Sequence, residues 1–216
     1  VCAAMDEWPA IREQSLEILE GSALDFSAFR SGEAAGSKGW VLADRDGHLR
    51  FAEEALPRRF HCASLVLAGP NGGVPSKSET DRFVTQLVRA GYTIARLHFV
   101  DAVLMTGRKD DFGFDPELLD RMHYLMSKLK AAGIYWFIDG LTSENGAMGN
   151  VLPNRFVNQH NLKERLYYDP KAFEHWRRLV TSLWATVNPY TRLAPLADPA
   201  LIGVITVNEG SLAYLA

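Results

Sequence analysis

The chain has 216 residues, of which 47% are hydrophobic and 11% aromatic, so it holds enough apolar surface for a sizeable core. Its formal net charge of −3 gives no electrostatic basis for binding nucleic acid or an anionic membrane surface. No apolar run approaches the roughly 18 residues of a transmembrane helix, and the first residues lack the pattern of a signal peptide. Cys2 and Cys62 are too few for a disulfide framework or a metal cluster, and we expect Cys62, in an apolar run, to be buried.

The N-terminal part of the chain predicts a leader that precedes the main domain. Residues 31–39, SGEAAGSKG, have the composition of a loop. Two short alternating runs follow in WVLADRDGHLRFAEE, on either side of Asp46-Gly47, which is a hairpin signal. We therefore expect residues 1–57 to form a leader with a two-stranded ribbon, and residues 58–216 to form the main domain.

Strands and helices alternate in the main domain. The apolar runs FHCASLVLAG, YTIARLHFV, IYWFIDG and LIGVITVNE are typical of strands buried on both faces. Helices are expected from Ser78, from Asp115-Pro116 and from Asp169-Pro170, each of which offers an N-cap. The third should bury Phe173, Trp176, Val180 and Leu183, and the stretch before it, residues 140–168, reads as a long loop.

The order β-α-β-α-β-α-β requires a parallel sheet with right-handed crossovers. Two closures of that sheet compete: an open doubly wound sheet and an eight-stranded barrel. The glycine-rich stretch GPNGG, residues 69–73, lacks the G-x-G-x-x-G spacing of a dinucleotide-binding turn. A flexible loop is the simpler interpretation of that stretch.

Polar residues gather where the apolar runs end, which is where parallel α/β folds place functional side chains. Arg96 and His98 alternate, so they share a face of their strand, and a buried arginine there needs an acidic partner. Each candidate also has a structural explanation, such as a core histidine or a carboxylate that caps a turn. Asp101 is expected in the loop beyond the second strand. The candidates are Arg96, His98, Asp101, Asp139, Asn208 and Glu209.

Several segments carry a resemblance to a known family. They are TVNEG at the end of the last strand, ARLHF, FDPELLDRMHYLMSKLKAAGIYWFIDG and VNPYTRLAPLADPALIGVITVNE, with GSALDFSAFR and DGHLRF upstream. Together they resemble the N-terminal half of a clan A glycoside hydrolase, a cellulase-type (β/α)8 TIM-barrel enzyme, over about residues 21–210. The resemblance implies about four βα units of such a barrel, preceded by a short β-hairpin.

The resemblance also implies roles for individual residues. Glu209 would be the general acid/base, and Asn208 would bind the 2-hydroxyl of the sugar. Arg96 would neighbour the nucleophile, while His98 and Asp139 would line the sugar subsite. The implied substrate is a β-linked glycan or glycoside, with no metal and no organic cofactor, and the favoured location is secreted or periplasmic. FHCASL on the first strand, and Gly after Glu209, depart from the family's usual residues.

A retaining glycosidase needs a second carboxylate about 5–5.5 Å from the first. By resemblance it would end the seventh strand, whereas four strands are expected here, and a full barrel takes about 250 residues. We therefore expect about half a barrel, inactive alone, whose open edge would meet the missing half or another copy of the chain. Two other functions stay open: a non-catalytic half-barrel that binds carbohydrate or a partner, and an aldolase- or isomerase-type barrel, although no lysine ends a strand.

Overall fold

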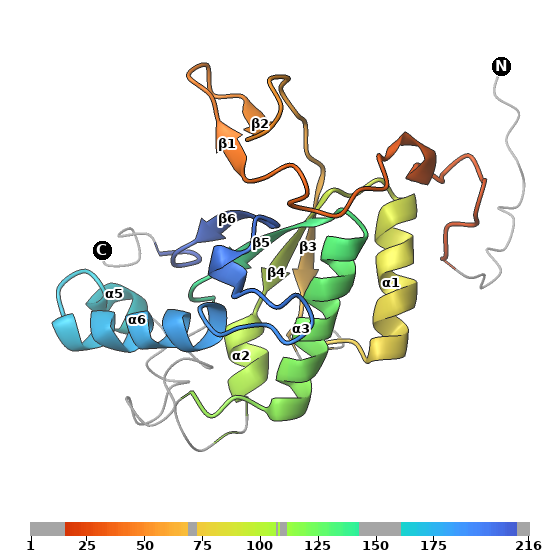
Figure 1. Cartoon of the computed structure of the whole chain (residues 1–216). Helices are drawn as coiled ribbons and strands as arrows, with labels where there is room; N and C mark the ends of the chain where they lie inside the picture. Colours follow the sequence, from red (N-terminus) through yellow and green to blue (C-terminus); the bar gives the residue numbers. More distant parts are fainter. Residues whose placement is uncertain (1–15, 69–72, 107, 109–111, 143–160, 211–216) are drawn as a thin grey trace, which may run out of the picture.

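A computed structural model describes residues 16–68, 73–106, 108, 112–142 and 161–210. Within them lie an antiparallel pair of strands and a four-stranded parallel sheet (Figure 1). The hairpin expected around Asp46-Gly47 is confirmed, with Val41 opposite Phe51. The strands are β1 (Val41–Ala43), β2 (Leu49–Phe51), β3 (Cys62–Val66), β4 (Ile94–His98), β5 (Tyr135–Asp139) and β6 (Leu201–Ile205).

The helices start mostly where the capping signals predict. Asp115 and Asp169 cap their helices with a proline in the first turn, as expected. The first helix is capped by Ser76 and not by Ser78, because Glu79 stands three residues after Ser76 and completes a capping box with it. The elements are η1 (Ser27–Phe29), α1 (Lys77–Arg89), α2 (Val100–Met105), α3 (Pro116–Ala131), α5 (Asn161–Arg165), α6 (Pro170–Trp184) and η3 (Pro195–Ala197).

The strand order decides between the two closures of the sheet. β3, β4, β5 and β6 are parallel neighbours in the order in which the chain makes them. Right-handed crossovers that all step in one direction place their helices on one face of the sheet. A doubly wound sheet must instead reverse its direction to cover both faces. Buried residues of α1, α3 and α6 share one core with buried residues of β4 and β5, so these helices cover one face of the sheet. The fold is therefore the first part of a (β/α)8 barrel, preceded by a hairpin (Figure 1).

The two faces of the sheet differ in chemistry. Ala95, Leu97, Trp136 and Ile138 are 0% exposed and belong to the core that packs against the helices. The alternate positions on β4 and β5 face the other way and include Arg96, His98 and Asp139. This second face is the one that would line the interior of a closed barrel.

Three sequence predictions, two about burial and one about a loop, are wrong at least in part. Cys62 is exposed, because β3 is an edge strand and its alternate residues Cys62, Ser64 and Val66 lie on the uncovered face. Of the four residues expected to be buried on α6, Leu183 is buried and Trp176 and Val180 are partly buried, whereas Phe173 is 50% exposed. The buried positions of α6 also include Ala172, His175 and Leu179. The stretch expected to be one long loop contains α5 before α6, and residues 143–160 lie outside the described part of the chain.

The hairpin closes the amino-terminal end of the sheet. The ring of Phe51, at the end of β2, stacks on Tyr135 with centroids 5.6 Å apart, and Phe60 meets both rings edge-on. Arg30 in the leader donates to the carbonyls of Tyr92 and Ala132, which lie just before β4 and β5. The leader thereby covers part of the amino-terminal end of the sheet. In the described part of the chain, no helix combines the length and the apolar character that crossing a membrane requires.

Candidate functional site

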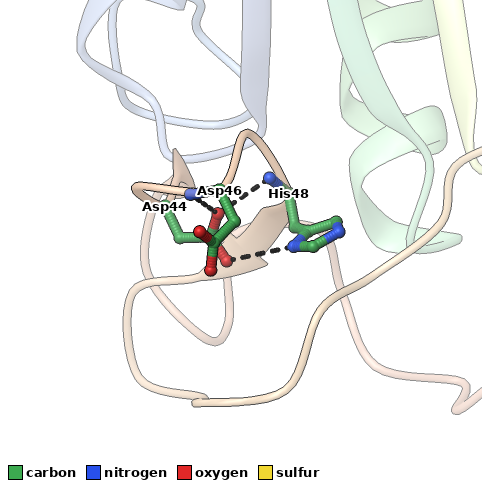
Figure 2. A group of neighbouring side chains, drawn as sticks. All are labelled: Asp44, Asp46 and His48. Atoms are coloured by element: carbon green, nitrogen blue, oxygen red, sulfur yellow. Dashed lines mark hydrogen bonds and ion pairs between the residues drawn. The ribbon is translucent and has the colours of Figure 1, made fainter.

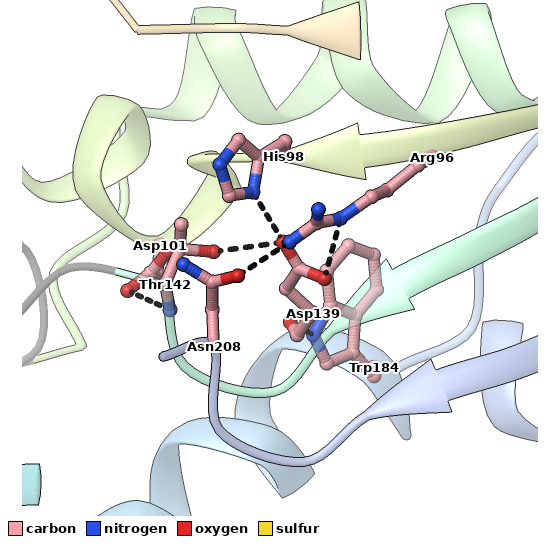
Figure 3. A network of polar contacts seen from close by, with 7 residues as sticks. All are labelled: Arg96, His98, Asp101, Asp139, Thr142, Trp184 and Asn208. Carbon is pink, nitrogen blue, oxygen red and sulfur yellow. Dashed lines mark hydrogen bonds and ion pairs between the residues drawn. The ribbon is translucent and has the colours of Figure 1, made fainter. Parts of the chain in front are cut away.

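A polar cluster lies at the carboxyl-terminal end of the parallel sheet (Figure 3). Arg96 binds Asp139 through two hydrogen bonds, Nε to Oδ1 at 3.1 Å and Nη2 to Oδ2 at 3.0 Å. The same Nη2 donates to Oδ1 of Asn208 at 2.7 Å, and Nδ1 of His98 lies 2.5 Å from Oδ2 of Asp139. The structure therefore brings together Arg96, His98, Asp139 and Asn208, which the sequence placed on three different strand ends.

The strand register accounts for this meeting. Leu97 pairs with Ile138 and Asp139 pairs with Ile205, so the ends of β4, β5 and β6 lie at one level. Asp139 is 2% exposed, and a buried carboxylate needs charged or hydrogen-bonding partners. Here it has both, from the guanidinium of Arg96 and the imidazole of His98.

The contacts of Asp139 fix the orientation of its neighbours. A carboxylate only accepts hydrogen bonds, so Nδ1 of His98 must carry the proton, which leaves Nε2 of a neutral ring as an acceptor. Arg96 only donates, so the atom of Asn208 that faces it must be the amide oxygen. The Nδ2 group of Asn208 then keeps its two protons for another acceptor. With a neutral His98 ring, the cluster offers one acceptor, Nε2 of His98, and one donor group, Nδ2 of Asn208.

Three further residues hold Asp139 and the segment after it in position, a role that could not be assigned to them from the sequence. Oγ1 of Thr142 donates to Oδ2 of Asp139 at 3.2 Å, and Nε1 of Trp184 donates to the Asp139 carbonyl at 3.0 Å. Asp101 lies in α2 and not in a loop, is 1% exposed, and accepts the backbone N–H of Thr142 at 3.1 Å. Of the three, Asp101 was a candidate from its place just beyond the second strand, whereas Thr142 and Trp184 were not among the candidates.

Glu209 lies on the turn that follows β6, beside the cluster but outside its hydrogen bonds. The turn is anchored where the Asn208 N–H donates to the carbonyl of Leu141 at 2.8 Å. Glu209 itself is exposed and has a φ of 52°, in the left-handed region that a non-glycine residue seldom occupies. Its carboxylate makes no hydrogen bond to the residues that the structure describes. Among the described residues, its side chain therefore adds no hydrogen bond to those that hold the fold.

A second group of polar side chains lies in the turn of the hairpin, at the other end of the sheet (Figure 2). Ligand atoms of Asp44, Asp46 and His48 lie within 4.8 Å of one another, which is close enough to hold a metal ion. Oδ1 of Asp44, however, accepts the backbone N–H groups of Asp46 and His48 at 2.9 and 2.8 Å. These bonds lower the pKa of Asp44 and fold the turn, so the arrangement has a structural explanation without an ion.

No protein-family model matches this chain, and no curated protein matches it. Several solved structures are similar to this chain in fold. The endo-1,4-beta-mannanase from Rhizomucor miehei is similar with a TM-score of 0.57 and 12% identity, over 79% of this chain and 48% of that one. A glycoside hydrolase family 5 mannosidase from the same organism, an E301A mutant, gives 0.56 and 13% over 80% and 49%.

The endo-beta-1,4-mannanase from Thermotoga petrophila gives a TM-score of 0.50 with 18% identity, over 70% of this chain and 35% of that one. This chain thus spans about half the length of these structures or less. At such identities the likeness concerns the fold. It agrees with the strand order and the single helical face described above. The chain has the fold of part of these glycoside hydrolases.

Proposed function

We propose that this chain carries the acid/base half of the active site of a retaining glycoside hydrolase that acts on a β-linked glycan. The observation that supports this most is the cluster of Arg96, His98, Asp139 and Asn208 at the ends of consecutive parallel strands, beside the turn that carries Glu209. In this fold, catalytic groups come from the ends of several strands.

Glu209 acts in this proposal as the general acid that protonates the leaving oxygen, and then as the base that activates water. Asn208, with its amide oxygen held by Arg96, presents Nδ2 to a sugar hydroxyl. Nε2 of His98, which stays an acceptor when Nδ1 donates to Asp139, accepts a hydrogen bond from a second hydroxyl. General acid catalysis of this kind contributes typically 10²–10⁴-fold to the rate.

The nucleophile must come from elsewhere. Asp139 is an unsuitable candidate, because its two oxygens are already bound by Arg96, His98 and Thr142. A nucleophilic carboxylate has to face the anomeric carbon from the opposite side of the sugar, about 5–5.5 Å from the acid. We therefore expect no turnover from these 216 residues alone, and turnover only where further βα units supply that carboxylate.

The solved structures suggest which substrate to test first. Two are endo-1,4-β-mannanases and one is a glycoside hydrolase family 5 mannosidase. We propose β-mannan and manno-oligosaccharides as first substrates, followed by β-glucans. Binding without any turnover, in a protein that has a complete barrel, would instead favour the non-catalytic carbohydrate-binding alternative.

The decisive experiment compares Glu209→Gln with the parent sequence in a polypeptide that includes the remaining βα units. Turnover of glycosides with poor leaving groups should fall by about 10²–10⁴-fold. Aryl glycosides with strongly acidic leaving groups need little proton donation and should be affected much less. Equal losses on both kinds of substrate, or no loss on either, would refute the acid role of Glu209.

A further inference from the structure

The turn of residues 206–210 holds Glu209 in a backbone conformation that its own sequence does not favour. The φ of 52° brings Cβ of an L-residue close to its own backbone, and such conformations persist only where the surroundings fix them. Gly210 follows and offers no side chain that could help to fix them. The contacts that hold the turn must therefore come from other segments.

Those contacts arrive from two sides. On one side the Asn208 N–H donates to the Leu141 carbonyl, and the Asn208 side chain accepts from Arg96. On the other side Nε1 of Trp176 donates to the Thr206 carbonyl at 3.1 Å. The hydroxyl of Tyr167 donates to the carbonyl of Gly210, the residue directly after Glu209. Other segments thus form hydrogen bonds to the turn at Thr206, at Asn208 and at Gly210.

Tyr167 differs from the other residues that bind the turn because burial of its ring in a core does not explain its position. Tyr167 is 55% exposed and lies two residues after the end of the short helix α5. Its backbone N–H donates to the carbonyl of Glu164 in that helix. The next residue, Tyr168, is 70% exposed, and its hydroxyl has no hydrogen-bonding partner among the residues that the structure describes. Both adjacent tyrosines are thus largely exposed, but only the hydroxyl of Tyr167 is bonded to the turn.

We propose that Tyr167 is a positioning residue that holds the turn of residues 206–210 and thereby the direction of the Glu209 carboxylate. Its hydroxyl fixes the exit of the turn, as Trp176 fixes the entry. The meaning of this role for catalysis rests on the proposed function, but the mechanical role does not. The two can therefore fail separately.

The first test uses the full chain, labelled with ¹⁵N, and needs no activity. Tyr167→Phe removes the hydroxyl and keeps the ring. Hydrogen exchange at the Asn208 amide should become about fivefold faster, the factor that corresponds to the loss of one ordinary hydrogen bond. NMR couplings should show that Glu209 leaves its left-handed φ part of the time. Amides in the core of α3 should exchange as before.

Tyr168→Phe is the matched control, since it removes a hydroxyl that makes no such bond, and it should change neither observable. Trp176→Phe tests the other end of the turn and should act in the same direction as Tyr167→Phe. Unchanged exchange at Asn208 in Tyr167→Phe, or an equal change in Tyr168→Phe, would overturn the proposal.

The second test concerns catalysis and uses the polypeptide with a complete barrel. Tyr167→Phe should lower kcat about tenfold on substrates with poor leaving groups, less on activated ones, with little change in KM, because a displaced acid weakens proton transfer and not binding. If exchange responds but the protein has no glycosidase activity, the positioning role stands and the proposed function fails. If activity is present and Tyr167→Phe leaves kcat unchanged although exchange at Asn208 responds, Tyr167 holds the turn but does not set the direction of the Glu209 carboxylate, and that part of the proposal is overturned.

Discussion

Arg96 and Asp139 form a two-bond ion pair across neighbouring strands, with side-chain exposures of 23% and 1%. Arg96 thus provides the positive charge and the hydrogen bonds that the buried carboxylate of Asp139 needs. Its geometry matches the planar fork of a guanidinium, which a lysine does not reproduce. The pair therefore sets both the stability of the sheet end and the orientation of the cluster.

The first prediction follows from this pair. Asp139→Asn keeps the side-chain shape but leaves Arg96 and His98 without a negative partner. We expect the free energy of unfolding to fall by about 3 kcal/mol, as for other ion pairs of which one partner is removed. Urea unfolding measures this change. Glu174→Gln is the control, because it breaks the exposed pair with Arg177 and should have no measurable effect. An equal effect of both substitutions would contradict the prediction.

The second prediction concerns pH. Burial lowers the pKa of His123, on α3, below its ordinary value of 6.5, and the charge of Asp120 offsets part of this effect. The unfolded chain therefore takes up a proton near pH 6.5 that the folded chain resists, so unfolding becomes easier as the pH falls through that range. His123→Leu should remove this component, and the stability difference between pH 7.5 and 5.5 should shrink. An unchanged stability difference between the two pH values in His123→Leu would contradict the prediction.

The third prediction concerns the approach of β5 to the segment after β6. A Cβ on Gly140 would lie 2.6 Å from the Thr206 carbonyl oxygen, and the Gly140 N–H donates to the Ile205 carbonyl at 2.7 Å. Gly140→Ala should therefore destabilise the protein by about 2–3 kcal/mol, because backbone atoms have to move. Gly47→Ala, at a positive φ with nothing within 4 Å, should cost only about 1 kcal/mol. Thermal unfolding separates the two.

The fourth prediction sets stability against function at Glu209. Glycine adopts a φ of 52° without a steric penalty, so Glu209→Gly should raise the free energy of unfolding by roughly 0.5–1 kcal/mol. The same substitution removes the carboxylate that the proposed function requires. Denaturant unfolding would detect the gain. A loss of stability would show that the carboxylate takes part in holding the fold.

Much of this site could be predicted because it depends on strand periodicity alone. Arg96 and His98 are two residues apart, so they share a face, and the ends of parallel strands share an edge. The support from Trp184 depends instead on how α6 crosses β5, which the sequence does not encode locally. Asp101 was misplaced because a short helix after a strand resembles a loop. Cys62 was misplaced because an apolar run does not reveal that its strand lies at an edge.

The stack of Phe51 on Tyr135 has a consequence for how the protein can be divided. Tyr135 is 5% exposed only while Phe51 and Phe60 cover its ring. A protein cut at residue 57 would lose Phe51 and uncover an aromatic surface at the base of the sheet. The leader thus covers apolar surface at the amino-terminal end of the sheet, and we expect it to be needed for a soluble, correctly folded protein.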